Sequence, residues 1–335
     1  MKRYLAPFLT VVLIVAVGAA IYFSVRDQFA GRNVEAVTGV VGSEKIPFFS
    51  DERVQEAFRR NGLDVQVQKA GSREIATSYD LSEYDFAFPA GVPAAEKLQR
   101  ENGISKSYNV FFTPMAIASW RTIGDVLVDN GIATDEEGYY IVDMDALLQL
   151  MSEEKRWEDL ADNDAFSVGR SILVNSTDVR TSNSAAMYLA LASYAANNDR
   201  IVESLDDARP LMPFLEDLFL RQGFRPSSSS EPFEDYLVKG MGHSPLVMIY
   251  EAQFISSAAQ ENGGITSDMA LMYPRPTIFT KHVLIPLSEA GERVGEALMT
   301  DPDLQKLAIE YGFRNNDTAY FRDYTSQHQV QIPDT

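Results

Sequence analysis

The chain has 335 residues, of which 45% are hydrophobic, and a formal net charge of −19 at pH 7. That length is sufficient for two domains with well-buried cores. The negative charge argues against nucleic acid or anionic lipid as a surface partner. There are no cysteines, which excludes disulfides, thiolate catalysis, cysteine-bound zinc and a lipoprotein anchor.

An apolar segment opens the chain. Lys2 and Arg3 precede a nearly uninterrupted apolar run, residues 4–25. A run of about 20 apolar residues is long enough to cross the hydrocarbon core of a membrane as a helix. A cleaved signal peptide usually has an apolar stretch of only about 7–15 residues. Residues 1–32 are therefore predicted to be an uncleaved signal anchor with one transmembrane helix, and cleavage after residues 18–20 is the alternative.

The orientation of this segment decides where the rest of the chain lies. Basic residues occur on both sides of the apolar run, so the positive-inside bias is weak. A short N-terminal tail stays inside more easily than a large domain. We therefore expect a single-pass protein of the cell membrane whose soluble body is extracytoplasmic.

Short apolar strands and amphipathic helices alternate through the rest of the chain. In chain order, the pattern predicts strand 34–41, helix 51–61, strands 63–69 and 84–89, helices 94–102 and 142–151, a helix start at 157–160, strand 171–174, helices 184–196 and 211–222, strand 246–250, and the helix pair 288–300 and 301–311. Strand–helix alternation with short loops is typical of an α/β fold with a parallel sheet and crossover helices.

Three further stretches do not fit that alternation. Residues 109–120 and 278–287 are longer apolar runs, of the kind that a chain crossing between two domains contains. The serines at 227–230, directly after Pro226, predict a solvent-exposed loop by their composition.

Four stretches, in their order along the chain, resemble one known family. They are 40–45 (Val-Val-Gly-Ser-Glu-Lys), 69–74 (Lys-Ala-Gly-Ser-Arg-Glu), 177–184 (Thr-Asp-Val-Arg-Thr-Ser-Asn-Ser) and 302–314, which ends in Gly-Phe-Arg. Their order resembles that of the type II periplasmic solute-binding proteins of ABC importers, which include the molybdate, sulfate and phosphate binders. The resemblance covers about residues 35–315.

This resemblance implies a two-lobed α/β fold, with two crossover segments and a ligand in the cleft between the lobes. Lobe 1 would combine residues 35–115 with 283–325, and lobe 2 would span residues 116–282. The two long apolar runs are the candidates for the crossings.

The candidate ligand site follows from the turns after the strands. Ligands of open α/β sheets lie beyond the carboxyl ends of the strands, where free N–H groups at helix starts favour an anion or a carboxylate. The resemblance and the polar side chains at these turns predict ligand contacts from Ser43, Ser72, Arg73, Thr181, Ser182, Asn183, Ser184 and Tyr250.

Each of these residues also has an ordinary structural interpretation. Serine, threonine and asparagine are the preferred N-caps of helices. Arg73, Arg180 and Glu44 can be solvated surface charges. Tyr250 can be a core aromatic whose hydroxyl is satisfied at the edge of the core.

A search for catalytic motifs finds none. The three histidines lack the spacing of metal ligands, and the chain has no nucleophile elbow, phosphate-binding loop or zinc-protease motif. We therefore predict no enzymatic activity, no cofactor and no metal site.

These patterns together predict an extracytoplasmic solute-binding protein. It would capture a small polar or anionic ligand, such as an oxyanion, in the cleft and deliver it to an ABC permease. The alternative is a membrane-anchored interaction or sensory protein that reuses the solute-binding fold. Nucleic acid is not expected as a partner.

Overall fold

The computed structural model describes residues 34–333. The predicted signal anchor, residues 1–32, lies outside that range. Within residues 34–333, no helix has the length and apolar character that a membrane crossing requires.

Nine strands form one mixed sheet. The strands are β1 (Glu35–Gly42), β2 (Leu63–Ala70), β3 (Phe86–Phe88), β4 (Tyr108–Trp120), β5 (Ala133–Asp135), β6 (Tyr140–Asp143), β7 (Val247–Tyr250), β8 (Met269–Arg275) and β9 (Phe279–Pro286). Their order is β2-β1-β3-β9-β4-β8-β6-β5, and β7 also pairs with β4. Pairing is parallel for β1 with β2 and β3 and for β6 with β8, and antiparallel elsewhere. The α/β fold class is confirmed, but the predicted parallel pairing holds for only part of the sheet, since the strand pairs around β9 and β4 and the β5–β6 pair are antiparallel.

Helices cover the sheet between these strands. They are α2 (Ile46–Ser50), α3 (Glu52–Arg60), α4 (Ser72–Thr77), α5 (Val92–Asn102), α6 (Arg121–Asp129), α7 (Met144–Ser152), α8 (Asn183–Ala196), α9 (Leu205–Ala208), α10 (Met212–Leu220), α11 (Ser230–Lys239), α12 (Glu251–Ala259), α13 (Glu289–Thr300), α14 (Pro302–Glu310) and α15 (Thr318–Gln327), with short 3₁₀ turns η1 (Ser43–Lys45) and η2 (Trp157–Asp159). Asp51, Asp143 and Asp301 cap three of the helices by accepting hydrogen bonds from first-turn N–H groups. Such local signals explain why several predicted helix starts lie within one or two residues of the observed ones.

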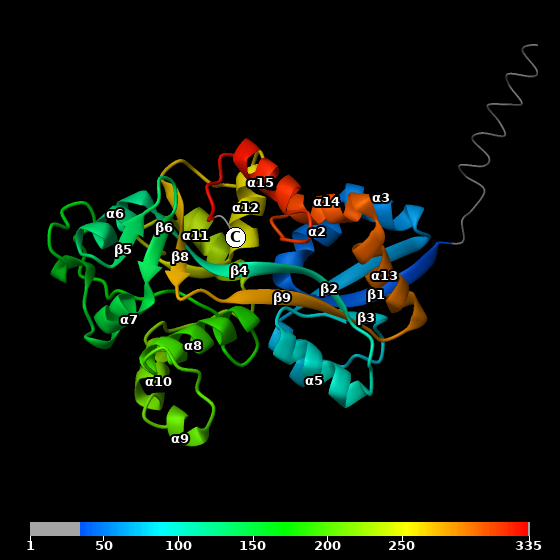
Figure 1. The fold of residues 1–335 in the computed structure, drawn as a ribbon, viewed down its shortest axis with the longest axis horizontal. Helices are drawn as coiled ribbons and strands as arrows, with labels where there is room; N and C mark the ends of the chain where they lie inside the picture. Colours follow the sequence, from blue (N-terminus) through cyan, green and yellow to red (C-terminus); the bar gives the residue numbers. More distant parts are fainter. Residues whose placement is uncertain (1–33, 334–335) are drawn as a thin grey trace, which may run out of the picture.

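The antiparallel strands β4 and β9 lie at the middle of the sheet. The first part of β4 pairs with β9, whereas its second part, from Met115 onward, pairs with β7 and β8. Figure 1 shows β4 and β9 lying side by side across the middle, with β1–β3 on one side and β5, β6 and β8 on the other. The two apolar runs at 109–120 and 278–287 form most of β4 and β9, and their role as the crossings between two lobes stays a prediction.

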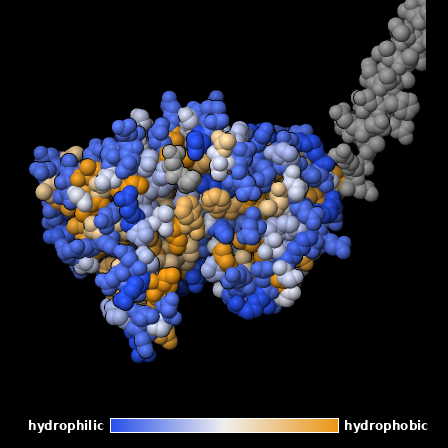
Figure 2. Space-filling view, viewed as in Figure 1, coloured by the Kyte–Doolittle hydropathy of each residue, from blue (hydrophilic) through white to orange (hydrophobic). Residues whose placement is uncertain are grey.

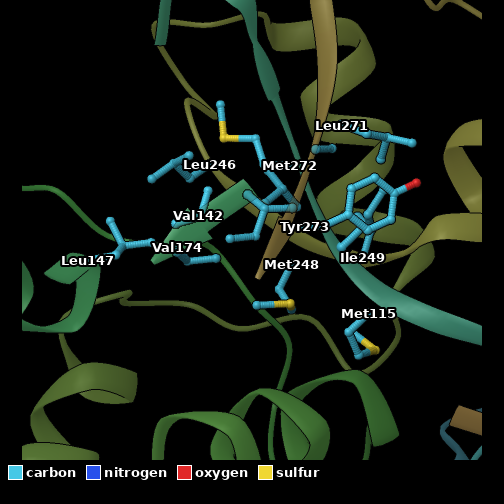
Figure 3. Close-up of a cluster of buried hydrophobic side chains, with 14 of the residues drawn as sticks. Met115, Val142, Leu147, Val174, Leu246, Met248, Ile249, Leu271, Met272 and Tyr273 are labelled. Atoms are coloured by element: carbon cyan, nitrogen blue, oxygen red, sulfur yellow. The ribbon is translucent and has the colours of Figure 1, made fainter. Parts of the chain in front are cut away.

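The hydrophobic core is divided in the same way. One cluster packs around the second part of β4, and Figure 3 shows Met115, Val142, Met248 and Met272 converging within it. Two other clusters pack around β1–β3 and β9. Separate cores support the division into lobes 35–115 plus 283–325 and 116–282, which we retain as a proposal. Phe321, with residues of the C-terminal tail, packs on the core of the second half.

Some predicted elements differ from the structure. Residues 171–174 contribute only an isolated bridge, between Ser171 and Arg156. The expectation of a solvent-exposed loop at 227–230 is wrong, since Ser228 and Ser229 are buried. The hairpin of β5 and β6, the strand β8, and helices α6, α12 and α15 were not predicted.

A buried ion pair joins the C-terminal segment to the junction of the halves. The Arg314 guanidinium donates to both carboxylate oxygens of Glu251, at 2.8 and 2.7 Å, and the Tyr273 hydroxyl donates to the same carboxylate at 2.6 Å. The backbone of Arg314 also exchanges two hydrogen bonds with Phe112 of β4. Because a buried charge is tolerated only when it is paired, this contact holds β4, β8, α12 and the C-terminal segment together.

Candidate functional site

Three loop-to-helix turns meet at one small cavity. Its free volume is about 10 Å³, close to the space that one water molecule occupies. Polar and small residues line it: Gly42, Ser43, Glu44, Ala70, Gly71, Ser72, Ser182, Asn183, Ser228, Ser229 and Tyr250. Larger surface cavities occur elsewhere, up to about 610 Å³. We place the candidate site at the small cavity because strand ends and helix starts converge there.

The first side of the cavity comes from the turns after β1 and β2. Gly42 and Ser43 lead from β1 into η1, and Gly71 and Ser72 lead from β2 into α4. The Ser72 hydroxyl accepts a hydrogen bond from the backbone N–H of Ala90 at 2.8 Å. That bond occupies a lone pair of the oxygen and leaves the hydroxyl proton available as a donor.

The second side comes from the start of α8 and the end of β7. The hydroxyl of Ser184 lies 3.0 Å from that of Ser182 and 2.9 Å from that of Thr177. The Asn183 amide donates to the Tyr250 hydroxyl at 3.1 Å. All of these side chains are buried, so each polar group depends on these partners to offset the loss of water.

Direct hydrogen bonds close the gap between the two sides. The carbonyl of Thr181 accepts from the backbone N–H groups of Arg73 and Glu74, at 2.9 and 3.1 Å. A methyl group at Gly71 would overlap that same carbonyl and would lie 3.1 Å from the carbonyl of Ser227. Gly71 therefore permits two backbone segments to approach more closely than any side chain would allow.

Two serines of the predicted solvent-exposed loop, Ser228 and Ser229, complete the wall of the cavity. The hydroxyl of Ser229 lies 3.4 Å from that of Ser43, so these residues bridge the two sides. Gln253 fixes this segment by donating to the Ser229 carbonyl at 3.1 Å and accepting from the N–H of Tyr250. The serine run gave no sign of burial, because its composition is that of an exposed loop.

A buried group of charged side chains lies at one end of the cavity. Glu44 contacts the ammonium of Lys45, which also lies 3.0 Å from His282 Nδ1. His282 Nδ1 is 3.3 Å from Glu44 Oε1, and the side chains of all three residues are at most 3% exposed. The interpretation of Glu44 as a solvated surface charge is therefore wrong. The adjacent Lys45 is the sequence feature that could have indicated burial of Glu44, because two opposite charges can be buried together as an ion pair.

The protonation of this group follows from its contacts. Burial alone would raise the pKa of Glu44, but the charge of Lys45 and the contact with His282 outweigh it and lower that pKa to about 2. Burial and the charge of Lys45 lower the pKa of His282 to about 4. At neutral pH the site thus holds a carboxylate and a neutral imidazole. Burial and the nearby Glu44 carboxylate raise the pKa of Tyr250 well above its usual value, so its hydroxyl keeps its proton.

The two arginines near the turns point elsewhere. Arg180 pairs with Asp178 at 2.5 Å and its side chain is 81% exposed. Arg73 is exposed, and neither arginine lines the cavity. Ser184 and Thr181 also do not line the cavity. The Ser184 hydroxyl is hydrogen-bonded to the hydroxyl of Ser182, and the Thr181 hydroxyl donates to the carbonyl of Ser227. Of the eight residues predicted to contact a ligand, five therefore line the cavity: Ser43, Ser72, Ser182, Asn183 and Tyr250.

In residues 34–333, no three acidic or histidine side chains are grouped in a way that could hold a metal ion.

Comparisons with known proteins agree on the fold. The chain is 17% identical to the sulfate-binding protein SubI from Mycobacterium tuberculosis, with a TM-score of 0.53 over 89% of this chain and 92% of that one. A putative phosphate ABC transporter substrate-binding protein from Clostridium perfringens, with bound phosphate, is 10% identical with a TM-score of 0.55, over 83% and 98% of the two chains. A periplasmic thiamin binding protein is 11% identical with a TM-score of 0.52, over 89% and 96%.

The chain has the fold of the type II periplasmic solute-binding proteins. At these identities the likeness shows the type II fold alone. A scan against protein-family models and a search of the curated proteins found no match. By their names, the three structural neighbours are binding proteins.

The close approach at Gly71 gives a first prediction. Gly71→Ala should push the Thr181 carbonyl away and break its hydrogen bonds to Arg73 and Glu74. Two such bonds contribute about 1–3 kcal/mol together, so their amides should exchange with solvent roughly ten- to a hundredfold faster. Hydrogen–deuterium exchange of peptides covering α4 measures this. Gly242→Ala is the control, because a methyl group there meets nothing within 4 Å. Unchanged exchange in Gly71→Ala would contradict the closed geometry.

The buried His282 gives a second prediction, about pH and stability. Between pH 6.5, its ordinary pKa, and about 4, its folded pKa, the unfolded chain binds a proton that the folded protein does not. Stability should therefore fall as the pH decreases through this window, by at most about 1.4 kcal/mol per pH unit. His282→Gln keeps an acceptor for Lys45 without titrating, so urea unfolding should show a shallower loss. His243→Gln, at an exposed histidine, should keep the wild-type slope. Equal slopes for the wild type and His282→Gln would show that burial does not hold this imidazole neutral.

Proposed function

We propose that this protein is a receptor for a small polar or anionic solute, bound between the two halves at the small polar cavity. The observation that supports this most directly is the convergence of Ser43, Ser72, Ser182, Asn183 and Tyr250, drawn from four separate segments, on one polar cavity. These segments are far apart in the sequence, so only the folded chain brings their polar side chains together. The structural neighbours that are named for sulfate, phosphate and thiamin have the same fold.

The chemistry of the lining suits such a solute. Ser72 and Tyr250 each accept a hydrogen bond from a neighbour and so keep an O–H proton free to donate. Donors that are already held in place by other bonds lose little entropy when a ligand arrives. Exclusion of water then strengthens each contact with the ligand.

Ligand entry requires the halves to separate. The cavity has about 10 Å³ of free volume, so any solute larger than water needs a wider opening. The two strands that connect the halves, β4 and β9, are the natural hinge, because the turns that line the cavity lie on either side of them. Arg73 and Arg180, exposed near the rim, would tune the charge that an incoming solute meets.

The partner we propose is an ABC permease, which would receive the solute from this protein. Delivery to a permease requires the soluble body to be outside the cytoplasm, tethered by the predicted helix in residues 1–32. Figure 2 shows a mostly hydrophilic outer surface on both halves, as a water-exposed receptor needs.

The proposed location can be tested in whole cells. With the body outside, protease added to intact cells or spheroplasts should digest the C-terminal part, and the full-length chain should fractionate with membranes. A cytoplasmic protein of known location is the control for cell integrity. Resistance of the body to the protease, with digestion only after lysis, would rule out an extracytoplasmic receptor.

The binding function itself predicts the effect of losing two hydroxyls. Mass spectrometry of the full-length protein should identify a co-purified solute, whose affinity can be measured together with those of sulfate, inorganic phosphate and thiamin. In the Ser43→Ala/Ser182→Ala variant, each lost hydrogen bond to a charged ligand should cost about 1.5–3 kcal/mol, or roughly ten- to a hundredfold in affinity. Thermal stability without ligand should be nearly unchanged.

The matched control is Ser105→Ala/Ser152→Ala, which removes two exposed hydroxyls. It should leave both affinity and stability as in the wild type. Lower stability of Ser43→Ala/Ser182→Ala with unchanged affinity would mean that these serines serve only to hold the fold.

A further inference from the structure

The C-terminal part of the chain forms a third connection between the two halves. Helix α14 packs in the first half, where Leu304 and Leu307 belong to a core around β1–β3. After the loop of residues 311–317, α15 and the tail behind it reach the second half. Phe321 of α15 and Val330 of the tail are 4% and 7% exposed, and both belong to the core around the second part of β4. Residues 318–333, which we call the strap, therefore join the halves in addition to β4 and β9.

The strap has side-chain contacts with both halves. Toward the first half, the Tyr320 hydroxyl donates to the carboxylate of Glu310 on α14 at 3.3 Å, and the Lys306 ammonium lies 5.9 Å from the centre of the Tyr320 ring. Toward the second half, the tail crosses the turn between β5 and β6, where a methyl group at Gly138 would overlap the side chain of Gln331. A rotation of one half against the other must therefore change one of these two sets of contacts.

The strap and the polar cavity lie on opposite sides of the central strands. Figure 1 shows α14 and α15 above β4, whereas α8 and α5 lie below β9 in the same view. The starts of α8 and α5 meet at the cavity, since Asn183 lines it and a methyl group at Gly91, the residue before α5, would overlap the Asn183 amide oxygen. A rotation about β4 and β9 that widens the cavity side must narrow the strap side. Packed side chains resist compression, so the strap has to move for the cavity to open.

The contact with the second half is the one that opening would break. A short loop and the Tyr320–Glu310 hydrogen bond keep α15 with α14, so the strap moves with the first half. Phe321 and Val330 would then leave the core of the second half and meet water. Their burial is favourable only while the halves stay together. The packing of the strap therefore stabilises the closed cavity relative to the open one.

A purely structural role for the strap would be to cover apolar surface of the second half. In that role, a smaller side chain at Val330 would lower the stability of the fold as any other truncation of the same core does. It would not favour opening of the cavity in particular. The two roles therefore differ in what they predict for access to the cavity.

We propose that the strap controls the separation of the halves: its packing on the second half holds the cavity closed, and its release admits the solute. This inference rests on the proposed function, because it concerns access to the same cavity.

Opening can be measured without any solute. The chain has no cysteine, so Ser228→Cys places a single thiol in the lining of the cavity, at a buried position. A maleimide can reach this thiol only when the halves separate. The labelling rate of the full-length protein therefore follows the population of the open form. Ser105→Cys, at an exposed position, gives the rate for a freely accessible thiol.

Variants of the strap should change this rate. In the Ser228→Cys protein, Val330→Ala removes packing that only the closed form has, so labelling should become roughly tenfold faster. Phe321→Ala should act in the same direction and more strongly, because it removes more buried surface. The matched control is Leu215→Ala, a core residue of the same half with the same 7% exposure, on α10 beside α7 and α8. It should lower stability against urea but leave the labelling rate close to that of the parent.

Each result decides between the two roles. Unchanged labelling in Val330→Ala, with the fold intact by circular dichroism, would overturn the inference even if Phe321→Ala fails to fold. Equal acceleration by Leu215→Ala would mean that the strap is only one part of the core. Labelling of the parent as fast as that of Ser105→Cys would show that nothing holds the cavity closed. Because no solute enters this experiment, failure to bind a solute would overturn the proposed function alone.

Discussion

The pairing of β4 with β9 is the contact on which the rest of the molecule depends. Both strands are mostly buried; β9 pairs with β3 and with the first part of β4, and the second part of β4 pairs with β7 and β8. Because β4 turns from β9 to β7 and β8 at Met115, one continuous backbone sets the position of one half relative to the other. The ends of β1, β2 and β7 can meet at a cavity only because this pairing fixes the distance between them.

Buried charges are concentrated beside that pairing. His282 lies on β9 and contacts Lys45 and Glu44 from the turn after β1, while Arg314 reaches Glu251 near Phe112 of β4. Burying each group costs desolvation energy that its pairing offsets, and breaking a pair would leave one ion buried without compensation. Buried ion pairs and hydrogen bonds thus stabilise the junction of the two halves, whereas an apolar core stabilises each half.

The sequence was informative where local patterns govern the structure. The apolar runs at 109–120 and 278–287 became β4 and β9, and the glycine–serine turns after β1 and β2 reached the cavity. Tertiary contacts decided the rest. Ser228 and Ser229 look solvent-exposed by composition, but Gln253 and Ser43 draw Ser229 into the interior. Hydrophobic periodicity cannot detect a buried Glu44–Lys45 pair, because it reads charges as surface.

The same limit explains why the ligand cannot be deduced from residue types alone. Serine and tyrosine hydroxyls both donate and accept, so by themselves they suit many solutes. What narrows the choice is the bond that each hydroxyl has already made. The hydroxyl of Ser72 accepts a hydrogen bond from the N–H of Ala90, and the hydroxyl of Tyr250 accepts one from the side-chain amide of Asn183. Each hydroxyl can therefore donate its proton to a ligand, whereas the carboxylate of Glu44 can only accept a hydrogen bond. Which of these groups donate and which accept depends on their hydrogen bonds to other residues of the protein. These bonds exist only in the folded chain.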